Sequence, residues 1–482
     1  MKRANLLSFG TSFSGKANEK AKDMFKTKDE TKSLGELTDY TVLDQYQVNV
    51  TGDSPPHPID DWSSFSQNLQ NSLLEAGFTK PTPAQRYSIP CFFASRPFIT
   101  ISPTGSGKTL AYALPLLQLL ENFPHNELKC IVLVPTRELA SQIFRQFRRF
   151  SESSATRVQL LRKNRDTPKC QILITTPKRL LIAKPNLDNV THIVIDEADH
   201  LLSHSFVQQT DQVLSLLQNP PAAKNEGEDQ GEKEPSTKPA PRNIHVSLFS
   251  ATMNPKVEES ARSFMTNPIR IQVGDNHAVA ALITQELKFV GREKGKVLEI
   301  RQRLNSGQIE LPVIIFVQNK QRAYDLFNEL GLPASILTAD QNDAQRAEAI
   351  RKVRTGDHQF LITTDLAGRG IDLAAIKSVI NFDLPPDSTT YIHRIGRTAR
   401  AGRAGHALTF FTEDDMPNLK PVASVMKKAG FHVEDWMLRN PDKQHRGARA
   451  LFEPTKRHTI SSRLWKNAKI RNPEPKVQPN VE

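Results

Sequence analysis

Residues 102–109, Ser-Pro-Thr-Gly-Ser-Gly-Lys-Thr, have the types and spacing of a loop that binds phosphate. An apolar run at 98–102 predicts a strand before this loop, and the residues from Leu110 onward predict a helix after it. At such a helix start, backbone N–H groups face anionic oxygens, and glycines let the backbone approach them closely. We expect Lys108 to neutralise the β- and γ-phosphates and the Thr109 hydroxyl to ligate Mg²⁺. The sequence therefore predicts an ATP site that contains Ser102, Pro103, Thr104, Gly105, Ser106, Gly107, Lys108 and Thr109.

A second candidate group is the acidic segment 196–199, Asp-Glu-Ala-Asp, which follows an apolar run at 192–195. Metal and water need carboxylates near the phosphate loop, at the end of a neighbouring strand. We expect Asp196 to hold Mg²⁺, directly or through water, and Glu197 to orient and polarise the attacking water. The structural alternative is an acidic helix start, since Asp and Glu there interact favourably with the helix dipole.

The elements that position these residues follow from an alternation of short apolar runs with segments of helical period. The runs lie at 98–102, 130–134, 171–175, 192–195 and 245–249, and then at 313–317, 360–364, 378–382 and 407–411. Apolar residues at helical spacing predict helices at 138–150 and 320–330. This alternation favours an α/β fold with two domains, each a mostly parallel sheet covered by helices on both faces. We expect the first domain at 61–275 and the second at 276–438.

Composition adds predictions for the remaining segments. Residues 1–60 predict a mostly disordered arm, residues 220–242 a low-complexity insertion, and residues 439–482 a basic tail. No apolar run approaches the roughly 20 residues that cross a bilayer, so we expect an intracellular protein without a membrane partner. Cys91, Cys130 and Cys170 are widely spaced and predict reduced core thiols. The net charge of +12 suits a nucleic acid partner, although solvated surface charge explains it equally well.

The acidic segment spells the name of the DEAD-box RNA helicases, and the other motifs of that family follow in order over residues 61–412. Gly77-Phe-Thr-Lys-Pro-Thr-Pro-Ala-Gln85 resembles the Q motif, and Ser250-Ala-Thr252 resembles the segment that couples hydrolysis to domain closure. In the second half of the chain, residues 314–319, 364–372 and 393–400 resemble motifs IV, V and VI. The resemblance implies two tandem RecA-like domains with ATP between them.

For the ATP site, the resemblance implies that Gln85 reads adenine through paired hydrogen bonds and that Trp62 or Phe65 stacks on the base. Asp372 would contact the ribose. Arg397 and Arg400 would reach the γ-phosphate as arginine fingers, because a charge-spread transition state gains most from cations that arrive on closure. The implied catalytic set is Lys108, Asp196, Glu197, Arg397 and Arg400. Without the family, the arginines of segment 393–400 read as a basic stripe on the surface of a helix.

The resemblance also assigns coupling and RNA contacts. The implied coupling residues are Asp199, Ser250, Thr252 and His393. The family grips the sugar-phosphate backbone of one strand, which carries no base sequence information. A strand bent by closure cannot remain in an A-form duplex, so local strand separation would follow. The implied RNA contacts are Thr136, Arg137, Thr176, Arg179, Arg346, Thr364 and Arg369.

Two further stretches, at 46–53 and at 410–430, resemble the Rok-type DEAD-box helicases of small ribosomal subunit assembly. That resemblance implies a monomeric nucleolar protein that acts on pre-ribosomal RNA together with ribosome assembly factors. The basic tail is either an RNA-binding segment or a nuclear import signal.

Several positions depart from the expected patterns. Ser102 stands where the general phosphate loop has glycine, Ala399 where motif VI usually has glycine, and Thr338 where histidine is common. The paired glycines often found between residues 150 and 171, which the family uses for one RNA contact, are absent. Two other functions remain open: a DNA-directed motor, which DNA but not RNA would stimulate, and an ATP-gated RNA clamp or scaffold with incidental turnover. A DEAD-box helicase for another class of RNA is a third alternative.

Overall fold

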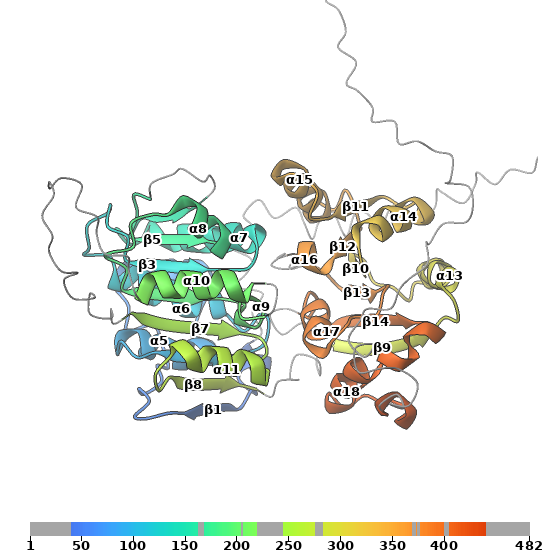
Figure 1. Cartoon of the computed structure of the whole chain (residues 1–482), viewed down its shortest axis with the longest axis horizontal. Coiled ribbons are helices and arrows are strands. Elements are labelled where there is room, and N and C mark those ends of the chain that lie inside the picture. The colour runs from blue at the N-terminus through green and yellow to red at the C-terminus, as the bar shows by residue number, and fades with distance from the viewer. Residues whose placement is uncertain are drawn as a thin grey trace, which may run out of the picture.

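The computed structural model describes residues 40–161, 168–203, 206–218, 244–274, 283–368, 373, 376–399 and 404–439. These residues form two α/β domains that lie side by side, each built on its own sheet (Figure 1). The first sheet has eight strands in the order β1-β8-β2-β7-β6-β3-β5-β4, and the second has six in the order β11-β12-β10-β13-β14-β9. All strand pairs are parallel except β1 with β8. The predicted α/β class is thus confirmed.

The central strands of the first sheet are apolar on both faces, which is the pattern of a covered parallel sheet. In β3, Cys130 and Val132 pack into one core cluster, whereas Ile131 and Leu133 pack into another. Helices α4 to α7 cover the first face, and α8 to α11 cover the second. The strands are β1 (Val48–Thr51), β2 (Phe98–Ile101), β3 (Cys130–Leu133), β4 (Val158–Leu160), β5 (Ile172–Thr175), β6 (His192–Ile195), β7 (His245–Ser250) and β8 (Ile269–Val273). The helices are α3 (Tyr40–Leu43), α4 (Gln67–Glu75), α5 (Pro83–Phe93), α6 (Lys108–Leu119), α7 (Arg137–Ser151), α8 (Pro177–Ala183), α9 (Ala198–Leu201), α10 (Val207–Gln218) and α11 (Pro255–Phe264).

The central strands of the second sheet are also apolar on both faces. In β10, Val313, Ile315 and Val317 pack toward one cluster, and Ile314 and Phe316 pack toward the opposite one. The strands are β9 (Ile283–Phe289), β10 (Val313–Val317), β11 (Ala334–Leu337), β12 (Phe360–Thr364), β13 (Ser378–Asn381) and β14 (Gly405–Phe411). The helices are α13 (Glu293–Asn305), α14 (Lys320–Leu330), α15 (Asp343–Arg354), α16 (Asp365–Gly368), α17 (Ser388–Ile395) and α18 (Lys420–Lys428), with 3-10 turns η2 (Glu413–Asn418) and η3 (Asp435–Leu438).

The disordered arm predicted for residues 1–60 is wrong for its last part. Residues 48–51 form β1, an antiparallel edge strand in which Val48 pairs with Val273 of β8. Val48 and Val50 pack against the core of the first domain. Four residues are too few to show a strand period, and the partner strand lies more than 200 positions away. The insertion at 220–242 and residues 440–482 of the tail lie outside the described residues.

The helices predicted at 138–150 and 320–330 are present as α7 and α14. The three cysteines are free and buried, as predicted, and burial raises the pKa of Cys91 and of Cys170 to about 12. Among the described helices, none combines the length and the apolar character needed to cross a membrane.

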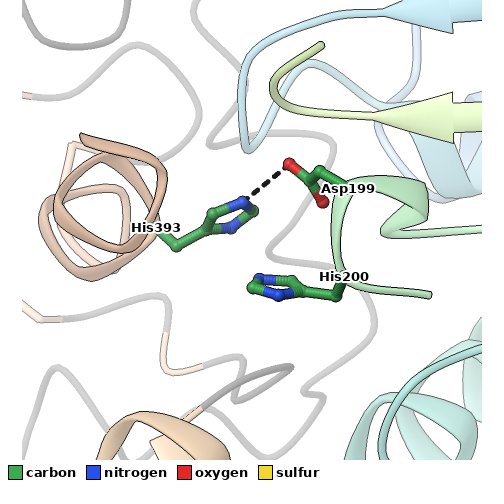
Figure 2. Close-up of side chains that lie close together, drawn as sticks. All are labelled: Asp199, His200 and His393. Atoms are coloured by element: carbon green, nitrogen blue, oxygen red, sulfur yellow. Dashed lines mark hydrogen bonds and ion pairs between the residues drawn. The ribbon is translucent and has the colours of Figure 1, made fainter. Parts of the chain in front are cut away.

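The two domains meet through α9 of the first and α17 of the second. The Nε2 atom of His393 on α17 lies 2.8 Å from the Oδ2 atom of Asp199 on α9, and both residues are buried (Figure 2). A second link joins the Arg346 guanidinium on α15 to the Glu138 carboxylate on α7 at 2.6 Å. These contacts bring together the ends at which parallel strands of both sheets stop, the usual place for ligands in α/β proteins.

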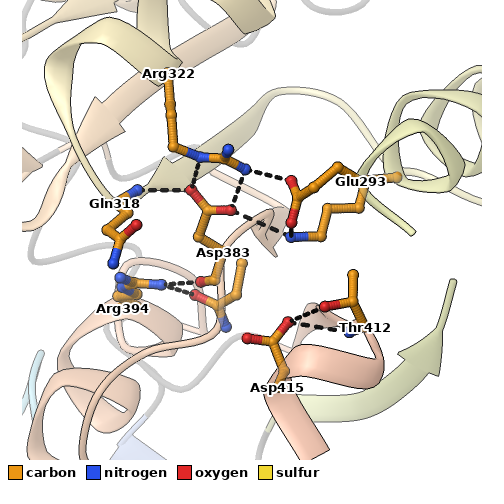
Figure 3. Close-up of polar contacts among 9 residues, drawn as sticks. Glu293, Gln318, Arg322, Asp383, Arg394, Thr412 and Asp415 are labelled. Atoms are coloured by element: carbon orange, nitrogen blue, oxygen red, sulfur yellow. Dashed lines mark hydrogen bonds and ion pairs between the residues drawn. The ribbon is translucent and has the colours of Figure 1, made fainter. Parts of the chain in front are cut away.

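A buried charge network braces the second domain (Figure 3). The Asp383 carboxylate, fully buried after β13, accepts hydrogen bonds from the Lys296 ammonium at 3.2 Å and from the Arg322 guanidinium at 2.6 and 2.7 Å. Glu293 contacts both cations, at 2.9 Å from Lys296 and 2.5 Å from Arg322. Asp383 also accepts from the Gln318 backbone N–H at 2.8 Å. Two cations and two carboxylates balance, so the group is neutral as a whole.

Asp383→Asn should destabilise the second domain by about 3 kcal/mol, because it leaves one buried positive charge without compensation. Adding Lys296→Met should recover much of that loss, since the double variant is again neutral. Urea unfolding of the full chain, followed by hydrogen exchange at the β10 amides, measures both effects. Equal stability of the single and double variants would contradict charge balance as the cause.

Candidate active site

The predicted phosphate loop connects β2 to α6. Its first residue is tied to the neighbouring strand, because the Ser102 N–H donates to the Ser250 carbonyl at 3.0 Å. Gly105 and Gly107 have φ values of +81° and +88°, a left-handed conformation that favours glycine. A Cβ atom on Gly107 would lie 2.5 Å from the Gln85 side chain. Since α6 starts at Lys108, its first N–H groups border this loop, as an anion site requires.

Residues at the start of α5 hydrogen-bond to the phosphate loop. The Gln85 amide donates from Nε2 to the Gly107 carbonyl at 3.1 Å, and its Oε1 accepts from the Thr82 N–H at 2.8 Å. The Thr82 hydroxyl donates to the Ser106 carbonyl at 2.7 Å. Gln85 therefore braces the phosphate loop in this structure, and its implied contact with adenine stays a prediction.

The two aromatic candidates for adenine stacking belong to the core of the first domain. Trp62 is 5% exposed and donates from Nε1 to the Phe78 carbonyl at 3.0 Å. Phe65 is 4% exposed and packs between Trp62 and Phe93. Neither ring offers an open face here, so stacking on a base would require one of them to become more exposed.

Lys108 lies inside the loop. Its ammonium donates to the carbonyls of Ser102 and Pro103 at 2.6 and 2.8 Å. Burial lowers the Lys108 pKa to about 8, and the nearby carboxylates oppose this shift. The side chain is therefore mostly protonated at pH 7, as a phosphate ligand must be.

The Asp196 carboxylate lies at the end of β6 and is buried. Its Oδ2 accepts from the Tyr112 hydroxyl at 2.9 Å, and its Oδ1 accepts from the Glu197 N–H at 2.8 Å. Burial, followed by the charge of Glu197, raises the Asp196 pKa to about 6. A bound dication would offset this burial cost, and the Asp196 carboxylate and the Thr109 hydroxyl, both of which interact with Tyr112, would supply hard oxygen donors. These two residues fit Mg²⁺.

Glu197 follows at the turn from β6 into α9, with a φ of +51° that few residues other than glycine adopt. Its buried Oε2 atom has no hydrogen-bond partner among the described residues. The Arg397 guanidinium of the second domain approaches its Oε1 to 3.9 Å and donates to the His393 carbonyl at 3.2 Å. A carboxylate with one uncommitted oxygen and a cation thus face each other beside the phosphate loop.

Asp199 connects three of the predicted coupling residues. Its Oδ2 accepts from the Thr252 hydroxyl at 2.6 Å, from the Thr252 N–H at 3.2 Å and from His393. The Asp199 N–H in turn donates to the Ser250 hydroxyl at 3.2 Å, and that hydroxyl donates to the Thr252 carbonyl at 2.6 Å. The Thr104 hydroxyl adds a bond to the Gly396 carbonyl at 3.3 Å. The loop, the acidic segment and α17 therefore form one hydrogen-bonded unit across the domain interface.

Five of the predicted RNA contacts line one groove of about 530 Å³ that spans both domains. Two arginines in it face an acid of the second domain: Arg137 lies 3.4 Å and Arg179 3.9 Å from Asp343 at the start of α15. Arg346 pairs with Glu138, as described above. The three arginines of the groove thus each pair with a carboxylate, and Arg179 and Arg346 also donate to the Leu161 and Thr338 carbonyls, each at 2.8 Å. The five residues are Thr136, Arg137, Thr176, Arg179 and Arg346.

The remaining predicted residues are placed as follows. Thr364 is half-buried at the end of β12 and is not part of the groove lining. Arg369, Asp372 and Arg400 lie outside the described residues, so their implied roles stay predictions.

Sequence reasoning missed two kinds of site residue. Tyr112 lies one helical turn after Lys108, and this spacing could have placed it beside the loop. Asp343 and Glu138 gave no local signal, because their importance comes only from contacts between the domains.

Comparison with known proteins agrees with this geometry. A family model described as DEAD/DEAH box helicase matches residues 82–260, and one described as helicase conserved C-terminal domain matches residues 295–402. The ATP-dependent RNA helicase ROK1 of Meyerozyma guilliermondii is 39% identical over 420 residues, which cover 82% of this chain and 74% of that protein. The probable ATP-dependent RNA helicase ddx52 of Dictyostelium discoideum is 37% identical over 419 residues, or 83% of this chain and 59% of that protein.

Among solved structures, S. cerevisiae Dbp5 bound to RNA and ADP BeF3 matches with a TM-score of 0.65 and 27% identity, covering 77% of this chain and 93% of that one. The two-sheet architecture and the family motifs named above occur together in this chain. The chain belongs to the DEAD-box ATP-dependent RNA helicases, and within them to the ROK1 type.

Proposed function

We propose that this protein hydrolyses ATP between its two domains when they close on RNA, and that closure separates a short stretch of RNA duplex. The observation that carries the proposal is the meeting of α17 with the acidic segment beside the phosphate loop. His393 and Arg397 of the second domain reach Asp199 and Glu197 of the first. Opening the domains would remove both contacts and leave half a site.

The chemistry follows from the charges that closure assembles. Glu197 would orient and polarise water through its uncommitted oxygen, and Lys108 would hold the phosphates. Arg397 would stabilise charge that develops on the transferred phosphoryl group, in a site from which burial excludes bulk solvent. Mg²⁺, when bound, would supply positive charge to the phosphate oxygens, and Asp196 and Thr109 would hold it.

The groove supports the proposed binding of a single RNA strand. Its arginines lie on both domains, so one strand can contact both only when they are close together. Phosphate would compete with Asp343 and Glu138 for these cations, and such competition is sensitive to salt. The contacts are to the backbone, so the groove selects no base sequence.

For the biological target, we propose precursor RNA of the small ribosomal subunit, bound by a monomer together with assembly factors in the nucleolus. The resemblance of the segments at 46–53 and 410–430 to Rok-type helicases supports this proposal. The net charge of +12 is compatible with it.

Glu197→Gln should lower RNA-stimulated hydrolysis by about a hundredfold or more, because the amide cannot polarise water as the carboxylate does. ATP binding should be retained, since Glu197 does not form the phosphate loop. Phosphate release with and without RNA, and binding of a fluorescent ATP analogue, measure the two properties. Glu259→Gln, an exposed change of the same type on α11, is the matched control and should leave both unchanged.

Asp343→Asn should raise RNA affinity by about two- to fivefold at low salt, because it frees two groove arginines from an exposed ion pair. The gain should shrink as salt increases. Fluorescence anisotropy with a single-stranded RNA measures it, and Asp414→Asn, an exposed change on η2, serves as the control. Unchanged or weaker binding by the Asp343 variant would count against this path for the strand.

The target is tested by crosslinking the protein to RNA in cells and sequencing the bound sites, with wild type and the Glu197→Gln variant in parallel. We expect reads concentrated on small-subunit precursor RNA, with more reads for the variant because it should release RNA slowly. Reads spread over another RNA class would overturn the ribosomal proposal and leave the helicase activity standing. Full cellular function of the inactive variant would instead favour an RNA clamp.

A further inference from the structure

Three side chains with metal-ligating atoms lie together at the domain interface: Asp199 and His200 on α9, and His393 on α17. One ligand atom from each lies within 4.8 Å of the other two, and all three residues are 5% exposed or less. The two imidazole rings lie beside each other with centroids 4.5 Å apart, next to the carboxylate (Figure 2). His200 belongs to none of the motifs that carry the proposed reaction.

The polar atoms at this point are not all used by the protein. The Oδ2 atom of Asp199 accepts the bonds from Thr252 and His393 described above, whereas its buried Oδ1 has no hydrogen-bond partner among the described residues. The buried Nδ1 of His393 also has none within that part of the chain. Native proteins leave few buried polar atoms in this state without a ligand or ion nearby.

Asp199 supplies the negative charge of this cluster. Burial by itself would raise the pKa of Asp199, but the adjacent His393 and His200 and the bond from Thr252 hold it well below its usual range. The carboxylate is therefore an anion at neutral pH. In this buried location, the attraction between the Asp199 carboxylate and a positive ion would be stronger than the same attraction in water.

Two imidazoles and one carboxylate are the ligand set of transition-metal dications such as Zn²⁺, whereas Mg²⁺ prefers oxygen ligands. Zinc bonds of about 2.0–2.2 Å place ligand atoms of a tetrahedral site nearer together than 4.8 Å, so small side-chain rotations would be needed. The described cysteines lie in the cores of the first domain and do not compete for the ion.

We propose that Asp199, His200 and His393 form a binding site for a transition-metal dication, with Zn²⁺ as the best match, and that the bound ion holds the two domains closed. One ring nitrogen of each histidine and one carboxylate oxygen would coordinate, with water completing the sphere. The proton on a coordinating nitrogen, such as that of the His393–Asp199 bond, leaves to solvent on binding.

The consequence is inhibition through closure. Because the ligands come from both domains, the complete site exists only in the closed form, and an ion that binds only this form stabilises it by linkage. Zinc should therefore slow reopening and the release of RNA. This step rests on the proposed closure cycle, whereas metal binding to the closed complex does not depend on turnover.

The experiment uses the full chain with single-stranded RNA, a non-hydrolysable ATP analogue and excess Mg²⁺. Calorimetric titration with Zn²⁺ should show one tight site, and a fluorescent RNA chase should show release slowed by about tenfold. His200→Gln should weaken zinc affinity by about 10- to 100-fold and abolish the slowing. Its RNA-stimulated hydrolysis without zinc should match wild type.

Two further variants keep the test independent of folding defects. His200→Cys retains a zinc ligand and should retain zinc binding and slow release. His245→Asn removes one ring of the stacked pair His192–His245, which forms no metal-ligating group with a carboxylate among the described residues, and should behave as wild type. Equal effects of zinc on wild type and His200→Gln, or no zinc binding by a closed wild-type complex, would overturn the site. Failure of the RNA complex to form before zinc is added would instead count against the proposed function.

Discussion

The buried contact between Asp199 and His393 is the constraint on which the rest of the site depends. It joins the first domain, just after β6, to α17 of the second domain. The His393 Nε2 and Asp199 Oδ2 atoms are 2.8 Å apart, and both residues are buried. The same carboxylate accepts a hydrogen bond from Thr252, so the position of the segment after β7 depends on the contact between the domains. A change at any one of these three residues must therefore affect nucleotide chemistry and domain closure together.

Contacts within the second domain hold α17, which carries the site residues of that domain. Arg394 of α17 donates to the Asp383 carbonyl at 2.7 Å and forms two bonds to the Asp365 carboxylate at 2.5 and 2.8 Å. Asp383 is the centre of the buried charge network, so this network also sets the orientation of α17 (Figure 3). Arg397 lies three residues further along the chain. Its position opposite Glu197 thus follows from packing within the second domain as well as from contact with the first.

Sequence reasoning predicted what is encoded locally. The phosphate loop, the acidic segment and the two-sided strands such as β3 and β10 show their chemistry or burial within a few residues. It failed where a partner far along the chain decides the outcome. Strand β1 exists because β8 offers it an edge, and Gln85 is turned toward Gly107 by a loop 22 residues away. The sequence around Asp343 does not indicate a role for it, because its contact with Arg137 forms only when the two domains meet.

The ion pairs in the groove bear on the proposed closure of the two domains. Under the proposed function, RNA phosphates would meet arginines that pair with Asp343 and Glu138 across the domain interface in this structure. Binding of RNA would exchange one set of charge pairs for another, so the net gain would be small compared with either set alone. The pair of Arg346 with Glu138 is largely buried, whereas the Asp343 side chain is 69% exposed. The pairs of Asp343 with Arg137 and Arg179 should therefore break before the Arg346–Glu138 pair does. In the proposed cycle, a nearly balanced exchange would let the free energy of ATP binding determine whether the domains stay closed, and hydrolysis would then favour the open form.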